Sequence, residues 1–241
     1  MSVSPRVQEQ PAFILHHRPF RDTSQILDVL SRDHGKIALV ARGSRAPKSK
    51  LKGVLRPFLP LRMSWVQRSD LGTLTGAESA GMPLSLGGDA LMAGYYANEL
   101  LLNFLHRHDP QPEIYDLYST ALHELRADSN IAACLRRFEI GLLELLGYAL
   151  EFEYAAGSTS DLEPQQSYEY RVEQGPVPVS RSEGALVFSG ATLLRIGAQD
   201  FDDEVVLRAA NRLLRRVISH HLGGKELKTR KVLQDLHRRS G

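Results

Sequence analysis

The first eighty or so residues contain five short apolar or alternating runs, and none of them has the length and periodicity of a helix. Within the fourth run, Leu61, Met63 and Trp65 share one period-2 register, which is typical of a strand with one buried face. Five short strands in so few residues predict a small barrel or sandwich of the size of an OB-fold. The runs cover residues 12–18, 24–31, 35–42, 58–68 and 72–78.

From Asp89 onward the apolar residues recur at intervals of three and four, which is the period of an amphipathic helix. Asn130 is a suitable cap for the third of the predicted helices, and Gly147 lies near its end. Either Asp200 or Asp202 can cap the last helix, which stops at a pair of glycines. The predicted helices cover residues 89–109, 112–128, 130–150 and 198–224.

Residues 151–190 are irregular, rich in Ser, Gly, Glu and Pro, and contain two strand-like pieces at 168–172 and 185–190. The whole pattern predicts an α+β protein, with an N-terminal OB-fold β-barrel followed by a mostly α-helical domain that carries a small irregular β insertion. We place the barrel domain at residues 1–80 and the helical domain at 81–241, with the insertion at about 151–190.

Composition excludes several classes of protein. The hydrophobic share of 42% is sufficient for a packed core, and no apolar run reaches the ~18 residues of a membrane span. The N-terminal segment lacks the apolar stretch of a signal peptide, so we expect a cytoplasmic protein. The single cysteine, Cys134, excludes an internal disulfide and a zinc site built on cysteines.

Charge is distributed unevenly along the chain, although the net charge is only +2. Residues 1–69 and 205–241 are strongly basic, whereas residues 70–204 are strongly acidic. Between Lys36 and Arg68 there are nine Lys or Arg residues and no Asp or Glu. A solvated face normally mixes both signs, so this run predicts a polyanionic partner.

The simplest alternative for the basic run is a solvated surface loop. Against it, Lys48, Lys50 and Lys52 alternate, so that in an extended chain they would lie on one side at about 7 Å spacing, close to the spacing of phosphates. Phe58 and Trp65 could stack on bases, or could belong to the core, and a positive groove with aromatic rings is how OB-type domains hold single strands. The predicted phosphate contacts are Arg42, Arg45, Lys48, Lys50, Lys52, Arg56 and Arg62.

The basic C-terminal segment is a second candidate contact with nucleic acid. Its arginines follow helical spacing, so most of them share one face. Pairing of these arginines with the acids of residues 151–204 is an equally good interpretation. The predicted contacts are Arg212, Arg215, Arg216, Lys225 and Lys228, with Arg208, Arg230 and Lys231 nearby.

Motifs for metal binding or catalysis are weak. His16–His17 and His220–His221 are adjacent pairs without a third ligand at metal-site spacing, so the sequence predicts no metal and no cofactor. The "GGKE" motif, residues 223–226, lacks the remaining features of a phosphate-binding loop. The acids of "DFDDE", residues 200–204, are better explained by helix capping than by catalysis, and we expect no enzyme.

The chain resembles the bacterial RecO family of DNA repair and recombination proteins. The similarity runs in order through six segments that span nearly the whole chain: "AFILHHRPFRDTSQILDVLSRDHGKIALVARGSR", "LKGVLRPFLPL", "YYANELLLNFL", "LRRFEIGLLELLGY", "ALVFSGATL" and "HLGGKELKTRKVL". The resemblance implies an OB-fold, a helical bundle, and a third part that binds zinc in some members. Here the segment after Gly147 has no cysteine, so we expect that part to keep a ribbon-like shape by packing alone.

The resemblance also implies function and partners. Such a protein binds single- and double-stranded DNA in the cytoplasm, at the nucleoid, and anneals complementary strands. With RecR it helps load RecA, an indirect partner, onto DNA coated by single-stranded-DNA-binding protein. An RNA-binding OB-fold protein attached to translation is the alternative, since single strands of either kind stack alike. A metal-dependent nuclease is a third possibility, but the acids show no grouping for it.

The acidic tail of single-stranded-DNA-binding protein ends in an apolar residue with a free carboxylate, and a guanidinium beside an apolar pocket is suited to such an end. The sequence offers Arg136 and Arg137 for this role within an otherwise acidic region, with Leu135 and Phe138 as pocket residues. Structural ion pairs, for example with Glu139, are the alternative interpretation.

Overall fold

The computed structural model describes residues 6–67, 69–127 and 130–229. The chain forms two compact units. The first contains the described residues up to 127 together with 227–229, and the second contains 130–226. None of the helices in these ranges has the length and apolar character that a bilayer crossing requires. The domain boundary near residue 80 stays a prediction.

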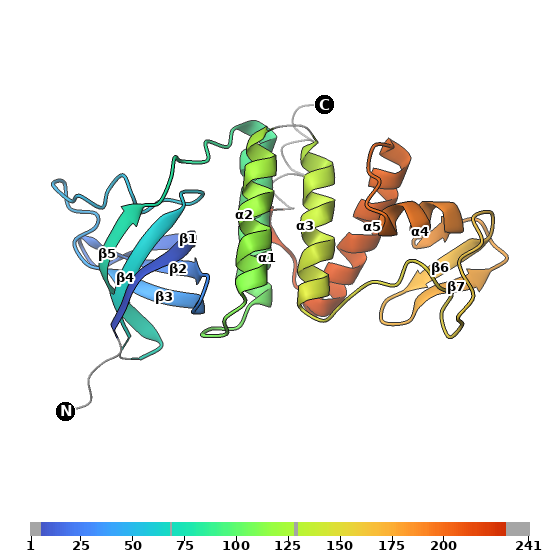
Figure 1. The fold of residues 1–241 in the computed structure, drawn as a ribbon, viewed down its shortest axis with the longest axis horizontal. Helices are drawn as coiled ribbons and strands as arrows, with labels where there is room; N and C mark the ends of the chain where they lie inside the picture. Colours follow the sequence, from blue (N-terminus) through green and yellow to red (C-terminus); the bar gives the residue numbers. More distant parts are fainter. Residues whose placement is uncertain (1–5, 68, 128–129, 230–241) are drawn as a thin grey trace. The chain divides into compact units, whose positions relative to one another are not determined.

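The first unit is built on a closed five-stranded barrel of strand order β1-β2-β3-β5-β4 (Figure 1). Neighbouring strands are antiparallel except β3 and β5, which pair in parallel. The predicted α+β fold with an N-terminal OB-like barrel is therefore confirmed. The strands are β1 (Arg6–Phe20), β2 (Ser24–Ser31), β3 (Gly35–Ala41), β4 (Leu61–Val66) and β5 (Leu71–Ser79).

The barrel interior follows the alternation in the sequence. Leu61, Met63 and Trp65 are at most 1% exposed and belong to the barrel core, so their predicted common register is confirmed. In β1, Ala12 and Ile14 belong to the same core. These side chains point inward because successive residues of a strand face opposite sides of the sheet.

The outer face of β1 is covered by two helices, α1 (Gly88–Phe104) and α2 (Pro112–Ala127). Phe13 packs against two tyrosines of α2, Tyr115 and Tyr118, with ring centroids 5.2 and 5.3 Å away. Asn98 of α1 donates to the Leu15 carbonyl at 2.8 Å and accepts from the Tyr118 hydroxyl. Because both faces of β1 are buried from Ala12 to Leu15, this part of the strand reads as a continuous apolar run rather than as an alternation.

The second unit combines α3 (Ile131–Leu145), α4 (Gly190–Gly197) and α5 (Glu204–His221) with a small sheet. The predicted cap of α3 is confirmed, because the Asn130 side chain accepts from the Ala133 N–H at 3.0 Å. The predicted cap of α5 at Asp200 or Asp202 was wrong. Asp203 caps that helix, accepting from the Val205 N–H at 2.7 Å, because it directly precedes the first helical residue.

The small sheet has the order β7-β6-β8, with β6 (Ser167–Arg171) between β7 (Gly175–Val179) and β8 (Val187–Ser189). Two of these strands match the predicted pieces. The sequence pattern did not predict β7, because its "GPVPV" contains prolines, which cannot donate to a ladder and are tolerated on an edge strand. It also missed α4, which spans only eight residues.

Candidate nucleic-acid interface

We call residues 42–60, which connect β3 to β4, the basic loop. Its apolar side chains are anchored on the barrel. Leu55 and Leu59 belong to the barrel core, and Leu51 and Val54 pack against that core. The cations of the basic loop are exposed, so the anchored loop presents its positive charges to solvent. These cations are Arg42, Arg45, Lys48, Lys50, Lys52 and Arg56.

The backbone of the basic loop is a succession of turns, and the predicted extended arrangement of its lysines was wrong. Bonds such as Ser49 N to the Ala46 carbonyl and Lys52 N to the Ser49 carbonyl close these turns at 3.0 and 3.3 Å. The alternation of Lys48, Lys50 and Lys52 therefore does not produce a linear row at strand spacing. The polar and apolar residues between the lysines form the turns and the anchors instead.

None of the six loop cations has a hydrogen bond or ion pair through its side chain within the described ranges. Arg62, on β4, is also exposed and donates to the Glu9 carbonyl at 3.1 Å. Cations that the fold leaves without an anionic partner are available to phosphates. The exposed cations therefore make the basic loop a candidate anion-binding surface of the first unit.

Neither aromatic ring proposed for base stacking is accessible. Phe58 is 5% exposed and packs against Tyr95, with ring centroids 5.1 Å apart. Trp65 is 1% exposed and lies in the barrel core, with the His34 ring at 5.2 Å. Both rings stabilise the fold, so this surface offers charge rather than a stacking platform.

The second unit has an open groove of about 740 Å³, lined by β6, by residues 185–186 and by one face of α5. Three predicted contacts, Arg212, Arg215 and Arg216, lie together in this groove. Arg171 of β6 joins them, and it was missed because nothing in the strand pattern indicates that β6 lies beside α5. Arg171 pairs with Glu169 at 3.1 Å, so its charge is partly neutralised.

The three arginines of α5 are held differently. Arg212 donates to the Val187 carbonyl at 3.2 Å, and its guanidinium lies 4.6 Å from the centre of the Phe188 ring. Arg215 and Arg216 are exposed and have no ion-pair partner among the residues that the structure describes. Pairing with acids, the alternative weighed for this helix, applies to Arg208, which contacts Glu204 at 3.4 Å.

Of the remaining basic residues of the C-terminal segment, the structure describes Lys225 and Lys228. Lys225 is exposed in the second unit. Lys228 is exposed in the first, where the Glu99 carboxylate accepts from the N–H groups of Lys228 and Thr229 at 2.8 and 2.9 Å. Arg230 and Lys231 lie outside the described residues.

The Arg136 side chain lies in the interior of the second unit and is bonded there. It is 7% exposed, and its Nε and Nη2 lie 2.8 and 2.9 Å from the two carboxylate oxygens of Glu139. Nη1 donates to Asn211 of α5 at 2.6 Å. This arrangement is the structural ion pair that the sequence analysis gave as the alternative, and it leaves no free edge of the guanidinium for a peptide carboxylate.

Arg137 points outward from the same helix. It is exposed, and its guanidinium lies 6.0 Å from the centre of the Phe201 ring. Leu135 beside it is half-buried, whereas Phe138 is 1% exposed and belongs to the interior. Of the four residues predicted to form a tail-binding pocket, Arg137 and Leu135 are the accessible ones.

The small sheet of the predicted insertion is packed through aromatic side chains. Tyr168 and Tyr170 of β6 are both 3% exposed, and Phe152 lies 6.0 Å from the Tyr170 ring. Burial raises the pKa of Tyr170, so its hydroxyl stays protonated, and that oxygen accepts from the Glu151 N–H at 3.2 Å. Aromatic packing and these hydrogen bonds therefore hold the sheet together.

These features define a class: a protein with an OB-like barrel and, in each of its two units, exposed cations that have no ion-pair partner in the described part of the chain. Residues 4–82 match the family described as Recombination protein O N terminal, and residues 87–231 match the family described as Recombination protein O C terminal. The chain therefore belongs to the RecO family, and that membership assigns it to DNA repair and recombination.

Curated relatives agree over nearly the full chain. DNA repair protein RecO of Aromatoleum aromaticum is 43% identical, over 98% of this chain and 99% of its own length. The protein of that name from Dechloromonas aromatica is also 43% identical, with the same coverage. The one from Methylococcus capsulatus is 39% identical over 95% of this chain and 94% of its own.

Proposed function

We propose that this chain binds single- and double-stranded DNA, anneals complementary strands and, together with RecR, helps load RecA onto DNA coated by single-stranded-DNA-binding protein. The observation that carries the DNA-binding part is the basic loop, whose six exposed cations have no anionic partner among the described residues while its apolar residues are anchored in the barrel. Membership of the RecO family supports the rest.

Phosphate contacts explain why such a protein would bind without regard to sequence. Lysine and arginine neutralise the backbone and release counterions, which gives affinity that depends strongly on salt but carries no sequence information. The burial of Phe58 and Trp65 removes the two rings that could have added base stacking. We therefore expect weak base preference and a steep salt dependence.

Annealing requires a protein to hold two strands and to shield their mutual repulsion. The basic loop and the α5 groove belong to different units, and each presents exposed cations without an ion-pair partner among the described residues. We assign one strand to each surface. Neither DNA binding nor annealing makes or breaks a covalent bond, so the proposal includes no catalytic residue. Binding to DNA would place the protein at the nucleoid.

The proposed contact with single-stranded-DNA-binding protein uses Arg137 and the half-buried Leu135. The tail of that partner is acidic and ends in an apolar residue with a free carboxylate. A guanidinium can receive the carboxylate through a charge-assisted hydrogen bond, and the leucine side chain can contact the apolar residue. Arg136 stabilises the helix that carries this surface, because its hydrogen bond to Asn211 links α3 to α5.

The decisive experiment measures annealing of complementary DNA strands by the purified full chain without ATP. We expect acceleration over the spontaneous rate at low salt and its loss at high salt. Complementary RNA strands in a parallel assay test the translation-linked alternative. Failure to accelerate annealing of DNA at any salt concentration would contradict the proposed function.

A further inference from the structure

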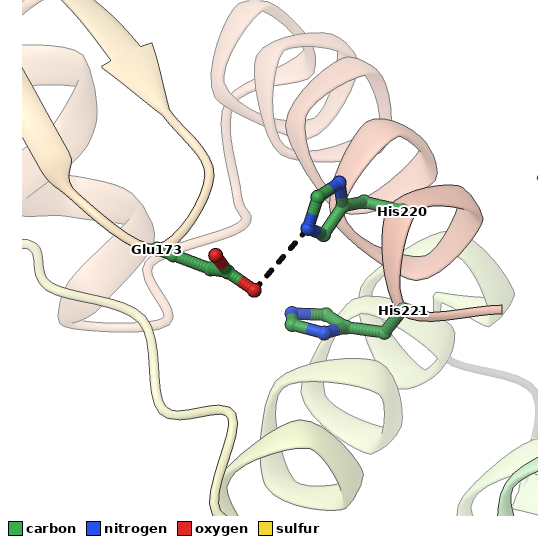
Figure 2. A group of neighbouring side chains, drawn as sticks. All are labelled: Glu173, His220 and His221. Carbon is green, nitrogen blue, oxygen red and sulfur yellow. Dashed lines mark hydrogen bonds and ion pairs between the residues drawn. The ribbon is translucent and has the colours of Figure 1, made fainter. Parts of the chain in front are cut away.

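Three side chains with metal-binding atoms meet beside the α5 groove. They are Glu173, His220 and His221, and one ligand atom from each lies within 4.8 Å of the others (Figure 2). The carboxylate Oε1 of Glu173 and the Nε2 of His220 are 3.2 Å apart. The proposed DNA contacts do not include these residues.

The fold creates this cluster from distant parts of the chain. Glu173 lies in the tight turn between β6 and β7, where its backbone has a positive φ of 67°. The two histidines are the last residues of α5, 47 positions further on. In the sequence, His220–His221 has no third ligand at metal-site spacing, and the packing of the β6–β7 turn beside the end of α5 supplies one.

The adjacent histidines converge because of the helix end and a neighbouring ring. The His220 and His221 rings lie edge to face, with centroids 5.2 Å apart. The His221 ring stacks on Tyr148, at 4.0 Å and an interplanar angle of 18°. Tyr148 thus holds one imidazole in place, while the exposed His220 and Glu173 can adjust by rotating their side chains.

We propose that Glu173, His220 and His221 bind a zinc ion, with a carboxylate oxygen and one imidazole nitrogen from each histidine as ligands and water in the fourth position. Zinc bonds of 2.0–2.1 Å in a tetrahedral site place neighbouring ligand atoms ~3.3 Å apart, close to the 3.2 Å between Glu173 and His220. Two imidazoles and one carboxylate are a common ligand set for this ion.

The charges and the solvent exposure around the three ligands determine how tightly the site would hold zinc. His220 also lines the α5 groove, where Arg215 and Arg216 add positive charge that opposes a dication, and the Glu173 carboxylate offsets part of it. Glu173 and His220 are exposed, so solvent reaches the fourth position. We therefore expect a reversible site that chelators empty, unlike the closed four-thiolate site that this chain cannot form.

The test titrates the full, untagged chain with Zn²⁺ in competition with a chromophoric zinc chelator. We expect one equivalent bound, and the variants His220→Ala, His221→Ala and Glu173→Gln should each bind at least about tenfold more weakly, since even loss of an outer-shell partner commonly has that effect. Cobalt in place of zinc should give the visible absorption of a four-coordinate ion, and His220→Ala should abolish it.

The other adjacent pair provides a matched control. His16 and His17 lie on β1, and no cluster of three ligands in the described part of the chain includes them. The variant His16→Ala/His17→Ala should therefore bind zinc like the parent. Circular dichroism verifies that each variant is folded. If folded His220→Ala binds zinc as tightly as the parent, the proposed zinc site is wrong. The contact between His220 and Glu173 in the parent is then an ion pair only.

Discussion

The Arg136 guanidinium and the Glu139 carboxylate form a buried ion pair one turn apart on α3, with Nε and Oε2 separated by 2.8 Å. Glu139 is fully buried, and Arg136 additionally bonds to Asn211 of α5. The pair therefore links two helices of the second unit. Its neighbour Arg137 is exposed, so adjacent residues of the same type have different roles.

Replacing Arg136 with alanine should destabilise the protein, because the substitution leaves the Glu139 carboxylate buried without its cation. Loss of one partner of a buried pair typically costs about 3–5 kcal/mol, and the midpoint of urea unfolding measures it. Arg137→Ala is the control and should unfold like the parent. Similar midpoints for Arg136→Ala and the parent would contradict this assignment.

Arg137→Ala should instead weaken binding of a labelled tail peptide of single-stranded-DNA-binding protein. A charge-assisted hydrogen bond contributes about 1.5–3 kcal/mol, which corresponds to roughly ten- to hundredfold in affinity. Fluorescence anisotropy measures the peptide affinity, and binding of naked DNA should scarcely change. A folded Arg137→Ala variant that binds the peptide as tightly as the parent removes this contact from the proposal.

Replacing Lys48, Lys50 and Lys52 with alanine should weaken DNA binding through charge alone. Each phosphate contact contributes about −0.7 to the log–log salt slope for single strands, so the slope should become shallower by about 2. Affinity should fall equally for all base sequences. Arginine at the same three positions keeps the charge and should keep the slope, whereas an unaltered slope in the alanine variant would count against the basic loop.

Local patterns were sufficient for the barrel and most helices. Leu61, Met63 and Trp65 alternate because one side of β4 faces the core, and that period is visible in the sequence. The cations of the basic loop are exposed, but the extended arrangement predicted for its lysines was wrong, because the loop is a succession of turns. No local pattern marks Leu51 and Leu55 as residues that pack on the barrel, and only the folded barrel shows that they anchor a chain of turns.

The features that the sequence did not predict depend on contacts between residues far apart in the chain. Arg171 and Glu173 carry no signal in the sequence, because their importance depends on β6 and its turn lying beside α5. The sequence offered Asp200 or Asp202 as the cap of the last helix, but the helix begins at Glu204, so Asp203 is the residue placed to cap it. Periodicity finds elements, but it does not specify which distant side chains meet.

Replacing Arg215 and Arg216 with alanine should slow annealing more than it weakens binding of one strand. These arginines line the α5 groove without an ion-pair partner among the described residues, whereas the basic loop in the other unit remains intact. A stopped-flow assay with labelled complementary strands measures annealing. Arg208→Ala is the matched control because Arg208 already pairs with Glu204 on the same helix. Parent-like annealing in the double variant would exclude the groove as the second DNA contact.

The bonds of Arg195 to two aspartates should make the stability of the protein depend on pH, because the stabilisation that they provide is lost in acid. The hydrogen bonds of Arg195 to Asp200 and Asp203, both 2.8 Å, hold the pKa of each carboxyl below its usual range. A pKa lowered by folding contributes stability above the unfolded value of ~3.9, and that contribution is lost as pH falls through the folded value. In Arg195→Met the melting temperature should therefore be lower than that of the parent near pH 7, and the difference should shrink below about pH 4. Thermal unfolding followed by circular dichroism across this range measures the difference in melting temperature.

Asp203 also caps α5, the helix that carries Arg215 and Arg216. Loss of the bond between Arg195 and Asp203 should therefore also make the α5 groove less rigid. A difference in melting temperature that stays constant from pH 7 to pH 3.5 would show that Arg195 acts through packing and not through these carboxylates.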